Sequence, residues 1–504
     1  MKIFRCDQIR QIDEYTIRNE PVSSTDLMER AAGRLFEWYT GRFDSAKPVF
    51  IFAGPGNNGG DGLALARMLA EKGYKIAIFF CGQPDNTSTD WKINRSRLET
   101  LTNVAFVTIS EIEQFPLLPP DSVIIDALFG SGLSRPLTGV YREIISKINE
   151  SGCTVISVDM PSGLFGEDNE GNDVNAIIKA GFTLSFHFQK LSFMFPENEK
   201  FTGKVHVLPI GLHNSIIEST ETPYRLIDSD MVKPLLKTRN KFDHKGTFGH
   251  GLMVGGSYGR MGAMVLGARA ALRTGIGLVT CHIPSGGNLI MQCAVPEAMA
   301  IHDRSEKNIS EIADPRSFSA AGIGPGMGKE KETETALQKF LVNCRIPLVI
   351  DADALNILSD NKKWFSDIPP MSILTPHPKE FERLAGKTEN GFERLRKQVE
   401  FSSENNCIVV LKGAHTSISE PGGKVYFNST GNNGMATAGS GDTLTGILMS
   451  LLAQGYEPLN ASIAGVFIHG LAGDIAAGRS SCESMIASDI IDSIGEAFNR
   501  IREG

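Results

Sequence analysis

The residues best suited to chemistry lie in a glycine-rich segment near the C-terminus, residues 431–446, which reads GNNGMATAGSGDTLTG. Small side chains ahead of an expected helix over residues 443–453 allow backbone N–H groups to face a bound anion. Gly439 and Gly441 would let the backbone approach phosphate oxygens. Asp442 would stand at the helix start, where it can hold a substrate hydroxyl or accept its proton. Since the P-loop pattern G-x-x-x-x-G-K-[ST] is absent from the sequence, the segment predicts a phosphate-binding loop of another kind.

Three further loops of the same half can serve this site. Residues 412–416, KGAHT, follow an apolar strand and offer a lysine cation and a threonine hydroxyl to a phosphate. Residues 322–328, GIGPGMG, form a turn that permits close approach of the backbone. His377 stands between two prolines, which stiffen its orientation. Taken alone, His377 fits a capping or packing role better than catalysis.

One motif points to a different class of enzyme. Residues 255–259, GGSYG, match the nucleophile elbow G-x-S-x-G of a hydrolase, and Asp351 and His377 follow in the order Ser, Asp, His. A match of five residues arises easily in a chain with 52 glycines. It also leaves residues 431–446 without a role. The hydrolase is therefore the weaker hypothesis.

In the first half, a strand expected over residues 48–53 runs into the turn AGPGNNGGDG, residues 53–62, followed by an expected helix over residues 62–72. The turn contains G-x-G-x-x-G between strand and helix, which brings a helix N-terminus to an anionic group. The dinucleotide fingerprint also requires an acid at the end of the next strand, and Asp85 lies too far into the following loop. We therefore do not expect an ordinary Rossmann cofactor site. A tight glycine turn with Asp61 as the helix N-cap is the structural alternative.

Two aspartates end strands of the same half. Asp126 ends the run VIID and Asp159 ends the run ISVD, and both precede polar loops. Open parallel sheets bind ligands at this carboxyl edge. Either aspartate alone could cap a loop, but with Asn58 and Ser162 they suggest an oxygen-rich pocket of low charge density. Such ligands suit a hard cation, and the neutral members favour a weakly held monovalent ion over zinc.

Alternating elements along nearly the whole chain must position these residues. Short β-branched runs alternate with helical patterns, which predicts βαβ units and largely parallel sheets covered on both faces. The pattern breaks at polar residues 213–223, so we place a boundary between an α/β domain of residues 1–220 and another of residues 221–504. The predicted strands are residues 48–53, 74–81, 122–127, 154–158, 182–188 and 203–209 in the first domain, and residues 251–255, 277–283, 347–350 and 407–411 in the second.

Composition and charge exclude several classes of partner. The chain has 504 residues and a mass of 54.7 kDa, and its 50 basic and 58 acidic side chains give a net charge of -8. We therefore expect no nucleic-acid or anionic-membrane partner, which would need a basic face. Residues 1–14 lack the apolar run of a secretory signal, and no stretch approaches the roughly 20 uninterrupted apolar residues that we expect of a membrane span. Eight scattered cysteines predict reduced thiols in a cytoplasmic protein without structural zinc.

In this order, the loops resemble those of the bifunctional NAD(P)H-hydrate repair enzymes. In that family an N-terminal epimerase domain is joined to an ADP- or ATP-dependent dehydratase domain of ribokinase-like fold. The resemblance covers nearly the whole chain, including QIRQID at residues 8–13 and LMERAA at residues 27–32. The motifs that carry it are GPGNNGGDG, DALFGSGLSRP, VDMPSGL, GGSYGRMGA, GPGMG, TPHPKE, KGAHT and GNNGMATAGSGD. Two positions depart from it, since family members often have proline where Asn433 stands and glycine where Lys379 stands.

The resemblance implies two sites for hydrated NADH or NADPH, written NAD(P)HX, with catalytic residues Asp159 and Asp442. The first domain's substrate contacts would be Asn57, Asn58, Gly59, Gly60, Asp61, Gly130, Ser131, Gly132, Leu133, Ser134, Arg135, Pro136 and Asp159. Its potassium ligands would be Asn58, Asp126 and Ser162. The second domain's substrate contacts would be Ala263, Gly326, His377 and Asp442, and its nucleotide contacts Lys412, Gly413, Ala414, His415, Thr416 and Gly441. GGSYG then belongs to a nucleotide-site loop rather than to a nucleophile elbow.

The implied activity is epimerisation of R- and S-NAD(P)HX and dehydration of the S form to NAD(P)H. The resemblance implies K⁺ in the first domain and Mg²⁺ with ADP or ATP in the second. NAD(P)HX and the adenine nucleotide are the expected partners, and we expect a homo-oligomer. Two alternatives stay open. One is a ribokinase-like small-molecule kinase with an N-terminal regulatory domain, and the other is a nucleotide sensor without catalytic activity.

Overall fold

The computed structural model describes residues 1–101 and 104–503, which form two compact units. The N-terminal unit comprises Lys2–Thr222 together with Asn390–Phe392. The C-terminal unit comprises Met1, Pro223–Glu389 and the chain from Glu393 onward. The chain thus passes from one unit to the other at Met1–Lys2 and at Thr222–Pro223, and it returns once to the N-terminal unit at Asn390–Phe392.

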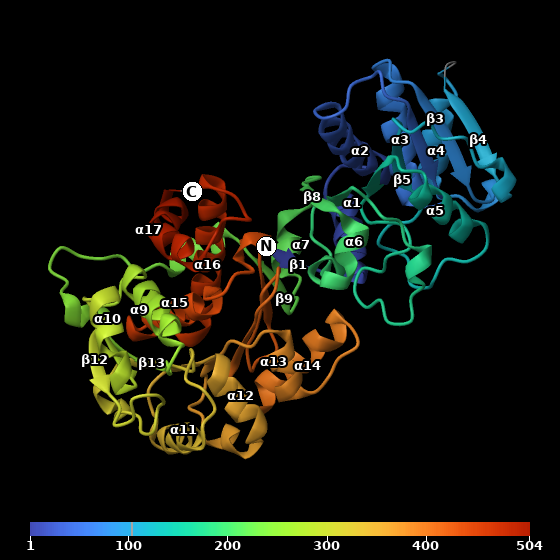
Figure 1. The fold of residues 1–504 in the computed structure, drawn as a ribbon. Coiled ribbons are helices and arrows are strands. Elements are labelled where there is room, and N and C mark those ends of the chain that lie inside the picture. The colour runs from blue at the N-terminus through green and yellow to red at the C-terminus, as the bar shows by residue number, and fades with distance from the viewer. Residues whose placement is uncertain (102–103, 504) are drawn as a thin grey trace. The chain divides into compact units, whose positions relative to one another are not determined.

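A fully parallel seven-stranded sheet forms the centre of the N-terminal unit (Figure 1). Its strand order is β4-β3-β2-β5-β6-β7-β8, so the direction of strand addition reverses between β2 and β5. Open α/β sheets bind ligands at such a reversal, outside the carboxyl ends of the strands. In sheet order the strands are β4 (Ala105–Ile109), β3 (Ile76–Cys81), β2 (Val49–Ala53), β5 (Val123–Ala127), β6 (Thr154–Val158), β7 (Phe182–Phe186) and β8 (Lys204–Leu208).

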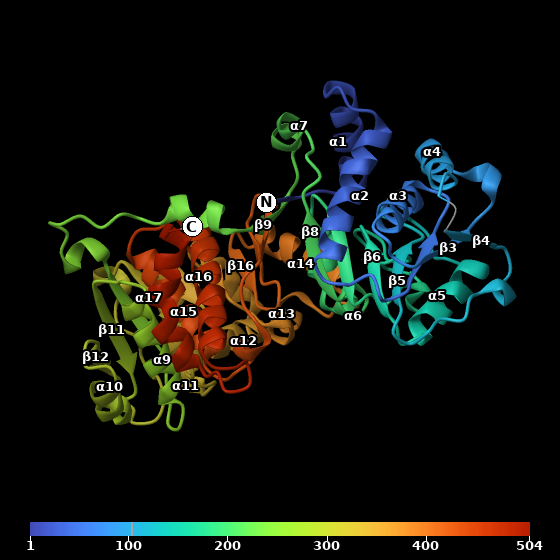
Figure 2. The ribbon, with the colours of Figure 1, turned by 90° about the horizontal axis from the view of Figure 1, so that it is seen from above.

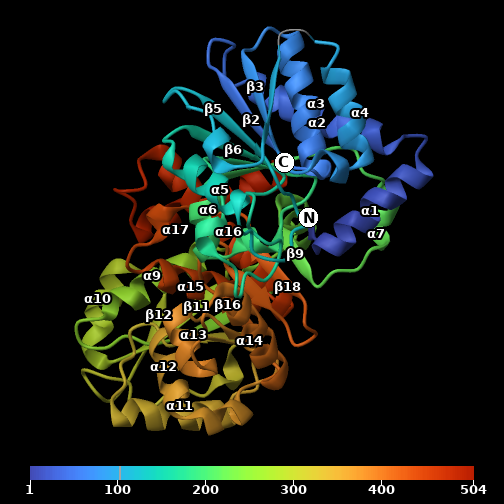
Figure 3. The same ribbon diagram turned by 90° about the vertical axis from the view of Figure 1, so that its right-hand side faces the viewer.

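Helices cover both faces of this sheet (Figure 3). Alternate side chains of a strand point to opposite faces, so Ile51 of β2 joins one core with Leu35 and Leu63, while Phe52 joins the other with Ile144. The helices are α1 (Cys6–Asn19), α2 (Ser24–Thr40), α3 (Asn57–Glu71), α4 (Thr89–Leu98), α5 (Val140–Glu150), α6 (Glu199–Thr202) and α7 (Asn214–Ser219), and a short strand, β1 (Lys2–Ile3), precedes α1.

The larger sheet of the C-terminal unit runs in the order β9-β18-β17-β16-β15-β14-β13-β10-β11-β12. Its pairs are parallel except for the hairpins β16-β17 and β17-β18. The strands are β9 (Tyr224–Ile227), β10 (His250–Val254), β11 (Leu278–Ile283), β12 (Met299–His302), β13 (Ala320–Ile323), β14 (Leu348–Ile350), β15 (Ile373–Leu374), β16 (Ile408–Leu411), β17 (Ser417–Ser419) and β18 (Val425–Asn428).

Two helical layers enclose this sheet (Figure 2). One layer contains α9 (Met261–Arg273), α15 (Ser440–Ala453), α16 (Pro458–Arg479) and α17 (Ala487–Glu503), and the other contains α11 (Lys331–Asn343), α12 (Ala352–Asp360) and α13 (Pro378–Ala385). The remaining helices are α8 (Ser229–Val232), α10 (Asn288–Ala294) and α14 (Gly391–Glu404). Two α/β units with largely parallel sheets confirm the predicted fold class.

Helix α16 is long and apolar enough to cross a membrane, with a mean hydropathy of 1.3 over its most apolar window. However, 78% of that window is buried inside the protein, where its side chains pack in the core with those of α15 and α17. Its composition is therefore that of a core helix that is apolar on all sides.

Candidate active sites

The first candidate site lies at the reversal point of the N-terminal sheet. Strand β5 pairs with β2 on one side and with β6 on the other, so the three motif loops leave neighbouring strands at one edge. These loops are the glycine turn after β2, residues 128–136 after β5 and residues 159–164 after β6. The structure thus gathers the sequence-predicted residues of this unit around one edge, although Ser134, Arg135 and Pro136 are exposed.

The glycine turn is shorter than expected, and the alternative role of Asp61 as an N-cap is wrong. Helix α3 begins at Asn57 with Gly56 as its N-cap, five residues before the predicted start. A Cβ atom on Gly59 would lie 1.9 Å from the carbonyl oxygen of Gly54, and one on Gly62 would lie 2.6 Å from Cβ of Ala127. These glycines therefore allow the first turn of α3 to pack closely against the strand ends, as the glycines of a Rossmann turn do.

Asp61 consequently lies inside the first turns of α3, where its side chain is buried. Burial, and next the nearby Asp159, hold the pKa of Asp61 well above its ordinary value. The neighbouring predicted contacts Asn57, Asn58, Gly59 and Gly60 form the start of the same helix. Asp61 is therefore a candidate proton donor as well as a substrate contact.

A hydrogen-bond network fixes Asp126 at the end of β5. Its Oδ2 accepts from Ser157 Oγ at 2.7 Å and from the Ser162 amide at 2.9 Å, and its Oδ1 accepts from Ser162 Oγ at 2.5 Å. The Ser162 hydroxyl in turn accepts from the Phe129 amide at 2.8 Å. Burial raises the pKa of Asp126, and the bonds from Ser162 and Ser157 oppose that rise.

Asn58 lies beside the loop after β5, because a Cβ on Gly130 would lie 3.3 Å from the Asn58 side-chain amide. The buried Nδ2 of Asn58 has no hydrogen-bond partner among the described residues. A 180° rotation of the amide would replace this unpartnered group by a carbonyl oxygen. Asn58, Asp126 and Ser162 then offer one carboxylate and two neutral oxygens, a set that fits K⁺ in its chemistry.

The second aspartate, Asp159, has an ion-pair partner that sequence reasoning missed. Its Oδ1 accepts from Lys190 Nζ at 2.8 Å and from the Phe186 amide at 3.2 Å. Only 1% of the Lys190 side chain is exposed, and its ammonium also donates to Ser185 Oγ at 3.1 Å. Asp159 has a φ of 63°, a conformation that non-glycine residues adopt rarely and chiefly at functional sites. The pair therefore fixes a buried carboxylate at the sheet edge.

Helix α1 brings a further acid to this site. Burial, and next the charge of Asp159, raise the pKa of Asp13 to about 7. One turn earlier on the same helix, Arg10 lies beside the loop after β5, since a Cβ on Gly132 would be 3.5 Å from its guanidinium. Asp13 was part of the motif QIRQID, but an acid within an amphipathic helix gives no signal of a catalytic role.

The second candidate site surrounds the N-terminus of α15 in the C-terminal unit. Gly439 caps this helix in the left-handed conformation with a φ of 89°, and Gly441 and Asp442 form its first turn. Burial, and next the charge of Asp351, raise the pKa of Asp442 to about 6. A carboxyl group with this pKa is ionised at neutral pH yet basic enough to accept a proton.

Asp351 and Lys412 fix the base of this site. Asp351 Oδ1 accepts from Lys412 Nζ at 2.8 Å, and its Oδ2 accepts from Thr445 Oγ1 on α15 at 2.7 Å. Burial lowers the pKa of Lys412, but the charge and the hydrogen bond of Asp351 have the larger combined effect, so the pKa is raised. A Cβ on Gly441 would lie 3.4 Å from Lys412 Nζ. The predicted nucleotide contacts Lys412 and Gly441 are therefore neighbours.

The rest of the KGAHT loop forms a turn between β16 and β17. The Gly413 amide donates to Thr416 Oγ1 at 3.2 Å, and His415 Nδ1 lies 3.2 Å from the carbonyl oxygen of Asn428. Ala414 is exposed at the tip. The Lys412 amide donates to the Pro376 carbonyl at 2.9 Å, so this loop adjoins the TPHPKE segment.

His377 has the capping role that its position between prolines suggested. Its Nδ1 accepts from the amides of Lys379 and Glu380 at 3.1 and 3.3 Å and caps α13. Its Nε2 lies 3.4 Å from Glu380 Oε1. Almost half of its side chain, 47%, is exposed, which leaves a ring face accessible to a ligand.

Gly326 and Ala263 are brought together beside Ser257. A Cβ on Gly326 would lie 3.3 Å from Cβ of Ala263, and Ser257 Oγ donates to the Gly326 carbonyl at 2.8 Å. The hydrolase hypothesis is therefore wrong, since Ser257 bonds to backbone, His377 caps a helix and Asp351 holds Lys412. No contact in the described residues assembles these three into a triad.

Fold and sites together define a two-domain α/β enzyme. One candidate site lies at a sheet reversal point, and the other lies at a glycine-rich helix N-terminus that has no Walker motif. Residues 24–192 match the family model described as YjeF-related protein N-terminus, and residues 252–496 match that described as NAD(P)H-hydrate dehydratase. The chain is 33% identical over 521 residues to the bifunctional NAD(P)H-hydrate repair enzyme Nnr of Moorella thermoacetica, covering 100% of this chain and 98% of that one.

The Escherichia coli enzyme of the same description is 30% identical, with coverage of 99% and 94%. A crystal structure of ADP/ATP-dependent NAD(P)H-hydrate dehydratase from Bacillus subtilis, co-crystallised with ATP and Mg²⁺, is 26% identical and covers 55% of this chain and 98% of its own, with a TM-score of 0.47. The chain belongs to the family of bifunctional NAD(P)H-hydrate repair enzymes.

Proposed function

We propose that the N-terminal domain predicted from the sequence, residues 1–220 with its site at the sheet reversal, interconverts R- and S-NAD(P)HX. The predicted C-terminal domain, residues 221–504, dehydrates the S form to NAD(P)H and consumes ADP or ATP. The observation that carries this assignment is the presence of two separate acid–base sites, one built on Asp159 and Lys190 and one on Asp442. A small-molecule kinase or a nucleotide sensor would leave the first of them without a role.

The dehydratase must remove a hydroxyl group from C6 of the hydrated ring, and hydroxide is a poor leaving group. Asp442 is placed to take the hydroxyl proton as that oxygen attacks the terminal phosphorus of the nucleotide, which breaks the bond from this phosphorus to the bridging oxygen and releases AMP from ADP, or ADP from ATP. The resulting phosphate ester then leaves C6 as inorganic phosphate, and loss of a proton from C5 restores the C5=C6 double bond. Lys412 and the amides at the start of α15 hold the nucleotide phosphates, because a helix N-terminus and an ammonium both favour anions.

Mg²⁺ fits this site in its donor chemistry, because it is bound through one or two carboxylates together with substrate phosphates. Asp351 and Asp353 are the carboxylates close enough to raise the pKa of Asp442. Asp353 accepts a hydrogen bond from the Gly328 amide at 2.9 Å, so its carboxylate contacts the loop of residues 322–328. When bound, the ion would neutralise charge on the transferred phosphoryl group.

The epimerase must break and remake a bond to C6, a carbon that carries both the ring nitrogen and the hydroxyl group. Departure of the hydroxyl needs a proton donor, and its return to the opposite face needs a proton acceptor. Asp61, with its high pKa, and Asp13, with a pKa of about 7, can donate, and Asp159 can accept. Bound K⁺, held by Asn58, Asp126 and Ser162, would supply positive charge next to the substrate.

Potassium dependence tests the cation part of this proposal. We expect faster conversion of purified R-NADHX to the S form in K⁺ than in Na⁺ at equal ionic strength, measured by chromatography. Removal of a ligand in Asn58→Ala should lower K⁺ affinity by about 10–100-fold. The exposed Asn86→Ala provides the matched control. Equal rates in the two salts would refute the potassium assignment.

Compartment and oligomeric state stay predictions. The chain's relatives are described by their activity, and the cytoplasmic location rests on the scattered cysteines alone. All eight cysteines are free thiols in the structure.

A further inference from the structure

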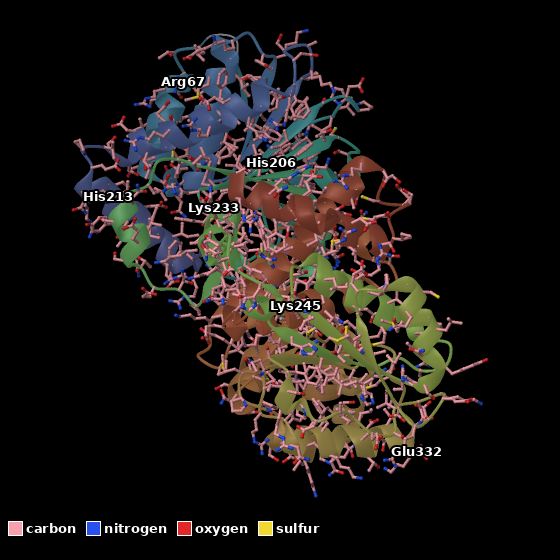
Figure 4. The ribbon with its side chains drawn as sticks, turned by 90° about the vertical axis from the view of Figure 1, so that its left-hand side faces the viewer. Arg67, His206, His213, Lys233, Lys245 and Glu332 are labelled. Atoms are coloured by element: carbon pink, nitrogen blue, oxygen red, sulfur yellow. The ribbon has the colours of Figure 1, made fainter. Side chains whose placement is uncertain are left out.

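A cavity of about 520 Å³ in the C-terminal unit adjoins the loop that carries Gly326. Its walls come from the loop that precedes α9, from the loop after β12 and from the start of α11. The lining residues used below are Ser257, Tyr258, Arg260, Lys307, Glu330 and Glu332. Glu332, labelled in Figure 4, lies in the first turn of α11. None of the predicted nucleotide contacts, Lys412 to Thr416 and Gly441, belongs to this lining.

Hydrogen bonds and close contacts connect the cavity to the proposed dehydratase site. Ser257 in its wall donates to the carbonyl of Gly326, and a Cβ on Gly326 would lie 2.8 Å from the carbonyl oxygen of Arg260. The Arg260 guanidinium lies 3.4 Å from Asp353, which in turn raises the pKa of Asp442. A ligand that contacts Gly326 and Asp442 can therefore continue into the cavity along Arg260.

The lining chemistry fits a nucleotide. The Tyr258 side chain is 81% exposed, and its amide donates to the Lys307 carbonyl at 2.8 Å. Lys307 Nζ stands 5.8 Å from the centre of the Tyr258 ring. An accessible aromatic ring can stack on a planar base, and the cations of Lys307 and Arg260 can bind a diphosphate.

The same cavity has a complementary acidic wall. Glu330 and Glu332 also line the cavity, and their carboxylates can accept hydrogen bonds from ribose hydroxyls. A volume of about 520 Å³ falls within the range of small-molecule sites. Since NAD(P)HX is a dinucleotide, its adenylyl half needs a place beside the reacting ring.

We propose that this cavity binds the adenylyl-diphosphate half of NAD(P)HX while its hydrated nicotinamide lies at Gly326 and Asp442. This inference rests on the dehydratase function proposed above. It assigns Tyr258 to the adenine ring, Lys307 and Arg260 to the diphosphate, and the two glutamates to the ribose. The adenine nucleotide that is consumed binds elsewhere, at the loop of residues 412–416.

A truncated substrate tests this assignment. The full chain is assayed with Mg²⁺ and ADP or ATP on the S hydrate of NADH and on the S hydrate of reduced nicotinamide mononucleotide, which lacks the adenylyl half. The wild-type protein should prefer the dinucleotide. Tyr258→Ala combined with Lys307→Ala should raise the KM for the dinucleotide by about 10–100-fold, the range that base stacking contributes, and leave the mononucleotide unaffected. The KM for ADP or ATP and the epimerase rate should not change.

A matched control variant shows whether the effect is specific to the cavity. Phe242→Ala combined with Lys331→Ala removes an exposed aromatic ring and an exposed cation of the same unit. This control should leave the KM for both substrates unchanged. Lys307→Glu is a further variant with a single substitution. It reverses the charge at position 307 and keeps the Tyr258 ring. Unchanged kinetics on the dinucleotide, or equal losses on both substrates, would overturn the cavity assignment. A wild-type protein inactive on both substrates would instead overturn the proposed dehydratase function, and this inference with it.

Discussion

Asp442→Asn is expected to lower the rate of S-NAD(P)HX dehydration by about 10²–10⁴-fold and to leave epimerisation unchanged. Asparagine keeps the size of the side chain but cannot accept the hydroxyl proton. The epimerase site lies in the other unit and shares no residue with the site around α15. Both activities are measured on the same variant, with Asp230→Asn, an exposed aspartate of the same unit, as control.

The pH profile distinguishes loss of a base from loss of structure. With the pKa of Asp442 raised to about 6, its carboxylate is present above that pH and lost below it. The kcat/KM of the wild-type dehydratase should therefore fall by roughly tenfold per pH unit below about pH 6. The residual activity of Asp442→Asn should lack this inflection. Equal loss of dehydration and epimerisation in the variant would contradict the assignment.

Lys190→Met is expected to destabilise the N-terminal unit by about 3–5 kcal/mol, because it leaves the buried carboxylate of Asp159 without its partner. Epimerisation should fall by at least roughly 100-fold, since Asp159 is no longer fixed at the sheet edge. Hydrogen exchange of β6 and β7 in the full chain measures the stability of this region. Lys179→Met, an exposed lysine of the same unit, is the matched control.

The double variant separates the stability effect from the catalytic one. Asp159→Asn combined with Lys190→Met removes both buried charges, so much of the lost stability should return while epimerisation stays absent. Dehydration should persist in every one of these variants. Wild-type hydrogen-exchange rates in Lys190→Met would show that the ion pair does not stabilise the fold. Full epimerase activity in the double variant would show that Asp159 has no role in the mechanism.

The strands that carry the motif loops were predictable because each is a short apolar run followed by a polar loop. Strands β2, β5 and β6 are buried over most of their length, so their composition gives a clear signal. Strand β4 was missed because it lies at the sheet edge with alternate residues exposed. The start of α3 was misplaced because its glycines serve contacts with neighbouring strands, which local propensity does not encode.

Some residues of the candidate sites could likewise be predicted from the sequence, and others could not. Asp126 and Asp159 were identified because a motif coincides with the end of a strand, and Asp442 because a glycine-rich motif coincides with the start of a helix. Lys190 was missed because it lies 31 residues from Asp159 and meets it only through the packing of β6 beside β7. The return of residues 390–392 to the N-terminal unit depends on a non-local contact too, the bond from the Gly391 amide to Glu197 at 2.6 Å.

We expect one chain both to epimerise and to dehydrate NAD(P)H hydrates. The most direct measurement mixes both epimers of NADHX with the protein, K⁺, Mg²⁺ and either ADP or ATP, and follows the near-ultraviolet absorbance of the dihydronicotinamide. We predict complete recovery of that absorbance, faster than spontaneous epimerisation allows. Recovery that stops at the S fraction would contradict the epimerase assignment, and no recovery with either nucleotide would contradict the repair function itself.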